Sequence, residues 1–325
     1  MRRRRFLSVL GGVVVVWPLA AFAQNPAKVV GLLSVGPPIA DNSRQGTPLV
    51  RRLAEHGYVL GRNLAFERRG AEGRIDHLPQ LVTELVASKV DVIVAFGYLP
   101  ALAAKEGSTL PAVAINAGDP VSTGLVESLA RPRGNLTGIS DVSVEVTPKR
   151  LELLKEIAPK LQRVAVLWNA NDPGMTSRYR ALEAGAKVLG VSVEPLGVRE
   201  PDDFDQAFET MNRDMPDAIL MVSDSLTTLN RKRVFEFATL HRLPAIYEYD
   251  YLVRDGGLMS YGPEDEESFM LAADLVVRIL KGAKPTELPF EQPTLFRFVL
   301  NLKTAKSIGL TIPPSILARA DEVIE

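Results

Sequence analysis

The chain alternates short runs rich in β-branched and aliphatic residues with longer amphipathic stretches. Runs such as 29–35 and 90–96 have the length of buried strands, and polar, Gly or Pro residues follow most of them. Parallel neighbours in a sheet need a long connection, usually a helix, so this alternation is typical of parallel strands joined by helical crossovers. The pattern predicts an α/β fold with parallel sheets.

The alternation occurs twice, and 325 residues at roughly 150 per domain also predict two domains. Thr147 is expected to cap the first helix of the second unit, with Pro148 at the first helical position. The strands of the first unit are expected at 29–35, 63–67, 90–96, 112–116 and 135–140, and those of the second at 163–169, 191–196, 218–222 and 245–247.

Further elements follow the second unit: a strand at 258–261, a helix from Pro263, a strand at 294–300 and a short helix capped by Asn301. They predict that the chain returns to the first lobe and then crosses once more. Lobe 1 is expected to comprise 24–143 and 257–290, and lobe 2 to comprise 144–256 and 291–325. The hinge segments are expected near 141–146 and 253–257. Several crossings between two lobes imply a cleft.

Residues 1–23 have the pattern of a signal peptide: a basic start, an apolar stretch at 6–19, and Ala21-Phe22-Ala23 as the cleavage site. The alternative is a membrane anchor, but 6–19 is shorter than the ~20 residues a spanning helix needs. A lipoprotein would need a cysteine at the cleavage site, and the chain has none. We expect a mature form that begins at Gln24 in the periplasm and is not inserted in the membrane. The twin-arginine and general secretory routes both stay open.

Composition and motifs argue against several function classes. The absence of cysteine excludes disulfides, thiolate nucleophiles and Cys-ligated metals, and His56, His77 and His241 lie in unrelated segments. A net charge of −1 gives no basic footprint for nucleic acid. No nucleotide-binding glycine motif follows a strand, and no complete GxSxG occurs. We expect no enzyme, no cofactor and no metal, although carboxylates from distant segments could still pair.

In open parallel sheets, ligands bind beyond the carboxyl ends of the strands, so the residues there are candidates for a binding site. The candidates of the first lobe are Ser34, Phe96, Gly97, Asn116 and Asp119, and those of the second are Asn169, Ser223, Asp224, Tyr247 and Glu248, with Tyr261 near the return crossing. Hydroxyls, amides and a few carboxylates suit a small polar ligand.

Most candidates also have a structural alternative. Ser34 and Asn116 could cap turns, and Asp119 could start a turn before Pro120. Asp224 could be a helix N-cap. Gly97 could be a loop breaker, and the rings of Tyr247 and Tyr261 could pack in the core. Sequence alone leaves both sets of roles open.

Several blocks along the chain resemble one bacterial family, the ABC transporter substrate-binding proteins that include tryptophan- and tyrosine-type uptake receptors. The blocks are Gly57-Tyr58-Val59, Gly61-Arg62-Asn63, Ala71-Glu72-Gly73-Arg74, Gly118-Asp119-Pro120-Val121, Gly124-Leu125-Val126, Ser128-Leu129-Ala130-Arg131-Pro132, Gly134-Asn135-Leu136-Thr137-Gly138 and Asn301-Leu302-Lys303-Thr304-Ala305-Lys306. Arg133 stands where the family pattern usually has glycine.

The resemblance implies a type I periplasmic-binding-protein fold, with two Rossmann-like lobes that close on a small molecule and deliver it to an ABC permease and its ATPase. A sensory receptor for a membrane signalling partner is the alternative. We expect an amino-acid-like zwitterion, with acidic groups such as Asp119, Asp224 and Glu248 near its ammonium. Ser34 and the amides after Asn42-Ser43 are expected near its carboxylate. A polar sugar or a short peptide would also suit this chemistry, and the oligomeric state is left open.

Overall fold

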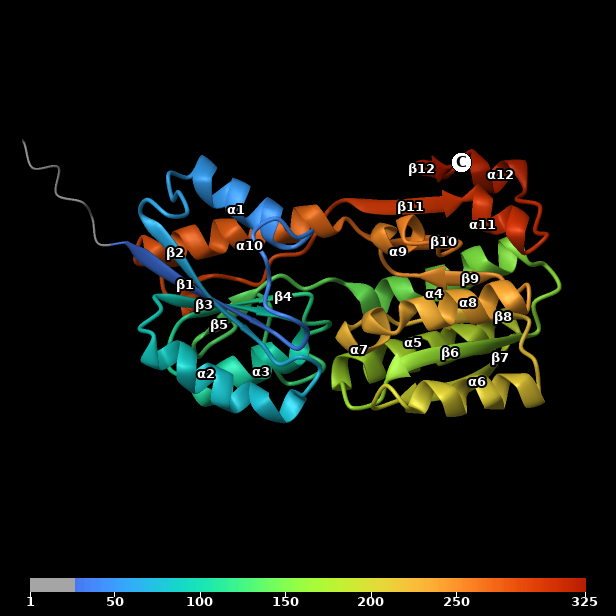
Figure 1. Cartoon of the computed structure of the whole chain (residues 1–325), viewed down its shortest axis with the longest axis horizontal. Helices are drawn as coiled ribbons and strands as arrows, with labels where there is room; N and C mark the ends of the chain where they lie inside the picture. The colour runs from blue at the N-terminus through green and yellow to red at the C-terminus, as the bar shows by residue number, and fades with distance from the viewer. Residues whose placement is uncertain (1–26) are drawn as a thin grey trace, which may run out of the picture.

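A computed structural model describes residues 27–325, which form two α/β lobes side by side (Figure 1). This confirms the predicted fold class. The expected signal peptide, with its cleavage before Gln24, lies outside the described residues. Between residues 27 and 325, no helix combines the length and the apolar character needed to cross a membrane.

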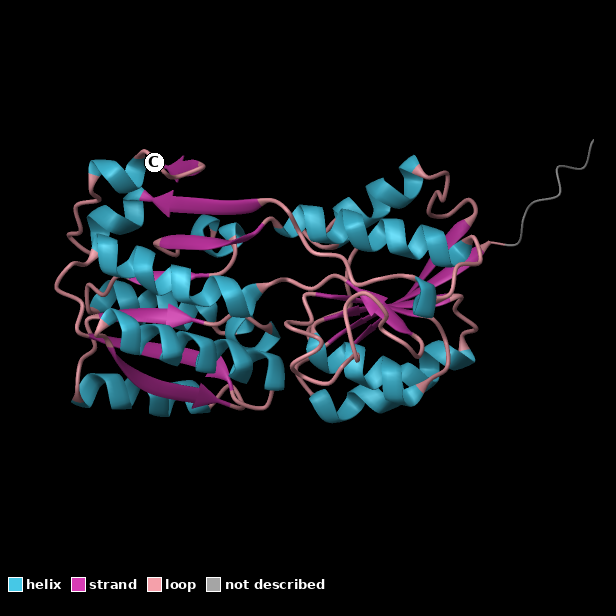
Figure 2. Ribbon diagram, turned by 180° about the vertical axis from the view of Figure 1, so that it is seen from behind, coloured by secondary structure: helices cyan, strands magenta, loops and turns pink. Residues whose placement is uncertain are grey.

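The first lobe contains a five-stranded parallel sheet in the order β2-β1-β3-β4-β5. Helices cover both of its faces, which explains why the central strands are apolar throughout (Figure 2). Helices α1 and α10 pack on one face and α2 and α3 on the other. The elements are β1 (Lys28–Ser34), α1 (Gly46–Glu55), β2 (Leu64–Gly70), α2 (Leu78–Ala87), β3 (Val92–Phe96), α3 (Tyr98–Gly107), β4 (Ala112–Ile115), β5 (Leu136–Gly138) and α10 (Asp265–Leu280), with short 3-10 turns at Ile75–His77 and Pro285–Glu287.

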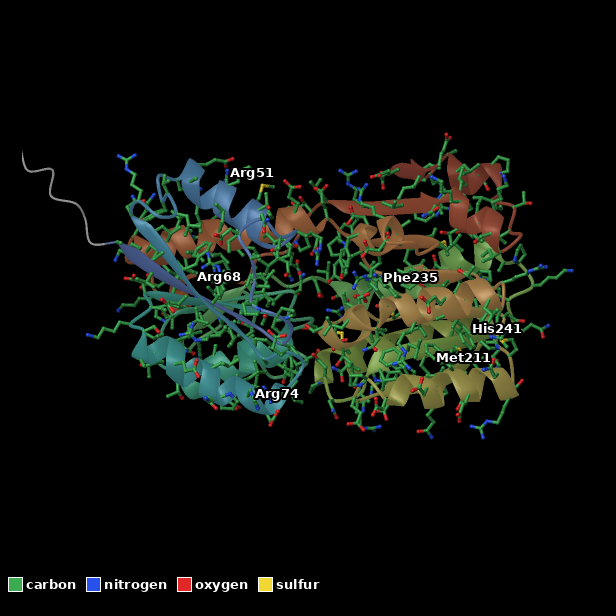
Figure 3. All side chains as sticks on the ribbon, viewed as in Figure 1. Arg51, Arg68, Arg74, Met211, Phe235 and His241 are labelled. Atoms are coloured by element: carbon green, nitrogen blue, oxygen red, sulfur yellow. The ribbon has the colours of Figure 1, made fainter. Side chains whose placement is uncertain are left out.

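The second lobe contains a seven-stranded sheet in the order β12-β11-β10-β9-β8-β6-β7, parallel except between β10 and β11. Helices α4 and α5 pack on one face, while α6 and α8 cover the other, where Met211 and Phe235 lie (Figure 3). The elements are α4 (Ser143–Ile157), β6 (Arg163–Asn169), α5 (Pro173–Leu189), β7 (Ser192–Val198), α6 (Asp203–Arg213), β8 (Ala218–Met221), α7 (Ser225–Leu229), α8 (Arg231–Leu240), β9 (Ala245–Tyr247), α9 (Asp250–Arg254), β10 (Met259–Pro263), β11 (Phe296–Asn301), α11 (Leu302–Ser307), α12 (Pro314–Leu317) and β12 (Glu322–Ile324).

The chain passes between the lobes after β5, between β10 and α10, and between residue 291 and β11. The second crossing differs from the expected one. The sequence predicts residues 257–263 in lobe 1, but β10 pairs with β9 and β11 in the sheet of the second lobe. The chain therefore crosses after Pro263 rather than near 253–257. A strand pattern shows that a strand forms and does not show which sheet it joins.

The expected start of α4 was wrong. The helix begins at Ser143, after a left-handed Val142 with φ of 46°, and Pro148 lies inside it. Thr147 does not cap the helix because it too lies inside it, and its hydroxyl accepts a hydrogen bond from Arg150 Nη1 at 2.9 Å. The expected cap at Asn301 is confirmed, since its Oδ1 accepts the N–H of Thr304 at 3.0 Å.

Candidate functional site

A cavity of about 230 Å³ lies between the lobes, where the carboxyl ends of strands from both sheets face each other. Lobe 1 lines it with the loop after β1, the start of α3 and the end of β4, and lobe 2 with the segments after β6, β8 and β9. A Cβ atom placed on Gly118 would lie 3.5 Å from the Cα of Gly174 in the other lobe. The lobes therefore touch, and the cavity has walls from both of them.

Seven of the eleven expected site residues line this cavity, and four lie elsewhere. Those that line it are Ser34, Phe96, Gly97, Asn116, Asn169, Ser223 and Asp224. Those that do not are Asp119, Tyr247, Glu248 and Tyr261. The rule that ligands meet strand ends locates the cavity, but it does not say toward which side of the strand end each side chain turns.

Three of the four misplaced residues have the structural roles weighed as alternatives. The carboxylate of Asp119 accepts the N–H groups of Val121 at 3.0 Å and Ser122 at 3.2 Å and so closes a turn. The ring of Tyr247 is buried and meets Phe235 edge-on, with centroids 5.1 Å apart. Tyr261 packs against the core of the second lobe.

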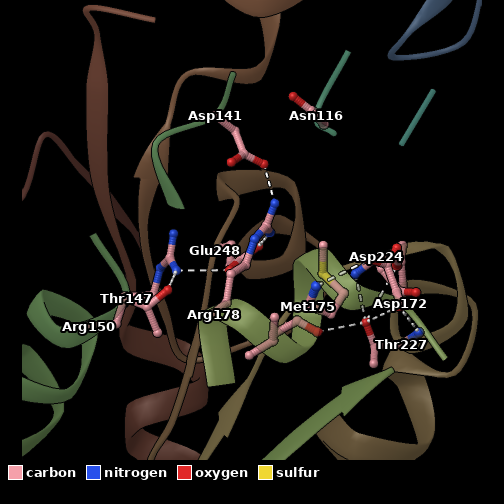
Figure 4. A network of polar contacts seen from close by, with 12 residues as sticks. Asn116, Asp141, Thr147, Arg150, Asp172, Met175, Arg178, Asp224, Thr227 and Glu248 are labelled. Carbon is pink, nitrogen blue, oxygen red and sulfur yellow. Dashed lines mark hydrogen bonds and ion pairs between the residues drawn. The ribbon is translucent and has the colours of Figure 1, made fainter. Parts of the chain in front are cut away.

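The fourth, Glu248, is held in a buried ionic network (Figure 4). Its carboxylate accepts hydrogen bonds from Arg150 Nη1 at 2.9 Å and Arg178 Nη1 at 2.7 Å. Arg178 also pairs with Asp141. All four side chains are at most 1% exposed, so Glu248 neutralises buried guanidinium groups instead of facing the cavity.

The wall from the second lobe carries two carboxylates at helix starts. Asp172 caps α5 by accepting the N–H groups of Gly174 at 2.8 Å and Met175 at 3.2 Å. Asp224 caps α7 through the N–H of Thr227 and also accepts from Asn169 Nδ2 at 2.6 Å. Burial and the repulsion of Asp224 raise the pKa of Asp172 to about 6, and burial also raises the pKa of Asp224. Holding these two carboxylates ionised is therefore costly, and a bound cation would offset that cost.

The wall from the first lobe carries Asn116, whose backbone is left-handed with φ of 55°. Its Nδ2 donates to Asp265 Oδ1 at 3.2 Å, and Asp265 also pairs with Arg44. Asn116 Oδ1 has no hydrogen-bond partner among the described residues, nor has Ser223 Oγ across the cavity. Buried polar atoms are normally satisfied, so these two atoms are expected to meet a ligand or ordered water.

Aromatic rings and a helix start complete the site. Phe96 and Tyr98 line the cavity from lobe 1, and Tyr249 and Tyr251 from lobe 2. Helix α3 begins at the cavity after Gly97, whose φ of 99° suits glycine and which supplies no side-chain cap. The first N–H groups of α3 are therefore available to an anion.

Sequence reasoning missed several of these residues. Asp172 carries a usable local signal, because an Asp followed by Pro at the first helical position is typical of an N-cap. Tyr249 lies just beyond an expected strand end, next to Glu248. Arg44 lies in a long loop, where no local pattern distinguishes it. Within residues 27–325, no group of three or more His, Asp or Glu side chains could hold a metal ion.

Comparison with known proteins agrees with this architecture. The family described as ABC transporter substrate binding protein matches residues 33–324. The chain belongs to this family. It is therefore a substrate-binding protein of the ABC transporter class and not an enzyme, as the sequence blocks indicated.

Individual relatives are distant but cover most of the chain. A tyrosine-binding protein of Clostridioides difficile is 25% identical over 84% of this chain and 78% of its own length. A conserved domain protein of Vibrio cholerae has a TM-score of 0.86 at 26% identity, covering 91% of this chain and 99% of that one. An ABC domain from Streptococcus pneumoniae, solved in complex with L-Trp, has a TM-score of 0.83 at 24% identity, covering 92% and 100%. These likenesses show a two-lobe fold of the periplasmic-binding-protein kind.

Proposed function

We propose that this substrate-binding protein captures a single α-amino acid with an aromatic or large apolar side chain and delivers it to an ABC permease. The observation that carries the proposal is the interlobe cavity, which combines two partly or fully buried carboxylates, unpartnered hydrogen-bonding atoms and four aromatic rings. The tyrosine-binding relative and the neighbour solved with L-Trp support the same ligand class.

The ammonium group of the ligand is assigned to the wall of the second lobe. Asp172 and Asp224 lie there, and each carboxylate raises the energy of the other in its ionised form. A cation between them would relieve that repulsion. Of the three carboxylates that the sequence predicts near the ammonium, Asp224 keeps this role, whereas those of Asp119 and Glu248 are committed to a turn and to buried arginines.

The carboxylate of the ligand is assigned to the start of α3 instead of the start of α1. The Ser34 hydroxyl donates to the carbonyl oxygens of Gly36 and Pro37. The N–H of Gly46, which opens α1, donates to Ser43 Oγ at 3.0 Å. Both expected donors are therefore occupied, whereas the amides after Gly97 have no side-chain cap.

The side chain of the ligand is assigned to the aromatic part of the cavity. Phe96, Tyr98, Tyr249 and Tyr251 offer faces and edges on which an aromatic ring can pack. A volume of about 230 Å³ is below the roughly 300–1,000 Å³ of pockets that hold drug-sized ligands. This favours one amino acid over a peptide.

Calorimetry and thermal shift with L-Trp and L-Tyr test the proposal. At a ligand concentration a hundredfold above Kd, binding adds about 2.7 kcal/mol and raises Tm by roughly 4 °C. Tryptamine lacks the carboxylate and indole-3-propionate lacks the ammonium, so both are expected to bind weakly. A sugar, a dipeptide or either analogue binding more tightly than all the amino acids tested would refute the zwitterion assignment.

We also infer that the protein acts in the periplasm after removal of residues 1–23, because these residues have the pattern of an export signal. N-terminal sequencing of protein from a periplasmic extract is expected to begin at Gln24. Recovery of only the intact form, in the membrane fraction, would contradict this. A pull-down that captures a permease and its ATPase, and no signalling receptor, would support delivery over sensing.

A further inference from the structure

One side chain that lines the cavity from the first lobe reaches a ring of the second lobe. The guanidinium carbon of Arg44, in the loop before α1, lies 3.7 Å from the centroid of the Tyr251 ring on α9. The same guanidinium pairs with Asp265 at the start of α10, in its own lobe. It therefore has an ionic partner in lobe 1 and an aromatic partner in lobe 2.

We infer that Arg44 and Tyr251 form a clasp that stabilises the closed arrangement of the lobes and slows release of the ligand. The inference rests on the proposed function for the identity of the ligand, but not for the closing of the lobes. Opening would separate the ring from the guanidinium because they belong to different lobes. The pair of Arg44 with Asp265 lies within lobe 1 and would survive opening, so of these two contacts only the one with Tyr251 would be lost.

Both halves of the clasp are held in place by their own lobe. The carboxylate of Asp265 is only 7% exposed and also accepts from Asn116 Nδ2, so it orients the guanidinium from a fixed position. The Tyr251 hydroxyl lies 3.3 Å from Thr228 Oγ1, and its ring stacks on Tyr249 with centroids 5.7 Å apart. Little side-chain freedom is then lost when the lobes close.

The chemistry of the pair explains why a contact of one cation with one ring is effective here. A guanidinium stacks on an aromatic face more readily than a strongly hydrated ammonium does. The Arg44 side chain is 39% exposed, so the attraction is partly screened by solvent. A cation over a ring in such a setting shifts an equilibrium by about 5-fold.

The ligand-free protein gives the first test. Because the chain has no cysteine, Thr83→Cys on α2 and Gln206→Cys on α6 place one spin label on each lobe without background, and both positions are exposed. The parent is expected to show a populated short interlabel distance. Arg44→Ala and Tyr251→Leu are each expected to reduce that population by about 5-fold, while Tyr251→Phe retains it because the ring remains.

The matched control is Arg51→Ala, which removes another arginine of the first lobe (Figure 3). Arg51 pairs with Glu266 within lobe 1, as Arg44 pairs with Asp265, but within residues 27–325 its guanidinium lies over no aromatic ring of the second lobe. This variant is expected to match the parent. A parent that shows only the long distance, or an Arg51→Ala variant that opens as much as Arg44→Ala, would overturn the clasp.

Stopped-flow dissociation of L-Trp gives the second test. Arg44→Ala is expected to raise the dissociation rate about 5-fold in the parent, and to leave it unchanged in a Tyr251→Leu background, whatever the Tyr251 ring itself contributes to holding the ligand. An equal effect of Arg44→Ala in both backgrounds would mean that Arg44 acts independently of Tyr251, which would refute the clasp. If L-Trp and L-Tyr fail to bind, the proposed ligand class fails, and the spin-label distances still decide whether the clasp exists.

Discussion

Arg178 Nη1 donates to Glu248 Oε2 at 2.7 Å in a region where neither side chain is more than 1% exposed. The same network reaches both of the first two crossings between the lobes. Arg178 pairs with Asp141 at the first crossing, and Arg150 Nε donates to the carbonyl of Tyr261 at 2.6 Å, just before the second. The network therefore attaches both crossings to the second lobe, and we expect bending on the side of the first lobe.

Replacing Glu248 by Gln is expected to lower the free energy of unfolding by about 3–5 kcal/mol, because two buried guanidinium groups would lose their shared counter-charge. Urea unfolding followed by circular dichroism measures the loss. Asp119→Ala, which removes only an exposed turn contact, is the control and is expected to cost about 1 kcal/mol. A loss below 1 kcal/mol for Glu248→Gln would show that the network is not stabilising.

The stability of the ligand-free protein is expected to depend on Asp172. Its pKa is raised from 3.8 to about 6 in the folded state, so the folded state binds more protons than the unfolded state between these values. The free energy of unfolding therefore falls as pH rises through this window, by about 3 kcal/mol for this group. Above pH 6 the folded protein bears the full cost of burying the ionised Asp172 carboxylate. Below pH 3.8 this group is protonated in both states and the cost is absent.

Asp172→Asn isolates this contribution, since asparagine is also a good helix cap. Relative to the parent, the variant is expected to gain about 3 kcal/mol between pH 4 and pH 7.5 in urea unfolding. Comparing the two proteins at each pH cancels the titration of all other groups. A constant difference across this range would contradict the raised pKa.

Amino-acid affinity is expected to fall below about pH 6, because protonation of Asp172 removes the charge that meets the ligand ammonium. The fall is up to about tenfold per pH unit. Calorimetry with L-Trp from pH 4.5 to 7.5 measures it. Asp172→Asn is expected to bind more weakly at pH 7.5 and to show a flatter profile. A parent affinity that stays constant over this range would place the ammonium elsewhere.

The substitution Ser223→Ala is expected to weaken ligand binding without changing the stability of the protein. The Ser223 hydroxyl lines the cavity and has no hydrogen-bond partner within residues 27–325, so its removal is expected to leave the free energy of unfolding unchanged within about 0.5 kcal/mol. Loss of a hydrogen bond to the ligand is expected to weaken L-Trp binding by about 0.5–1.5 kcal/mol, or roughly 2- to 12-fold. Equal affinities of parent and variant would exclude this hydroxyl from the site.

Local sequence predicts a site residue best when its place just beyond the carboxyl end of a strand is enough to put it at the cavity. Ser223 and Asp224 lie two and three residues beyond the end of β8, and Asn116 directly follows β4, so the strand-end rule places them at the cavity. The same rule fails for Glu248, one residue beyond β9. Its side chain turns toward Arg150 and Arg178, which come from α4 and α5 and are about 70 to 98 residues away in sequence.

The sequence by itself determined the two α/β units, the elements within them and the resemblance to a binding-protein family, because periodicity and helix or strand formation depend on neighbours along the chain. Only the tertiary structure decided that β10 joins the second sheet, that Asp172 faces Asp224, and that Arg44 meets Tyr251. Those outcomes depend on which distant segments pack together. Burial then selects the partner of each charge, since an unpaired charge in the interior is too costly to retain.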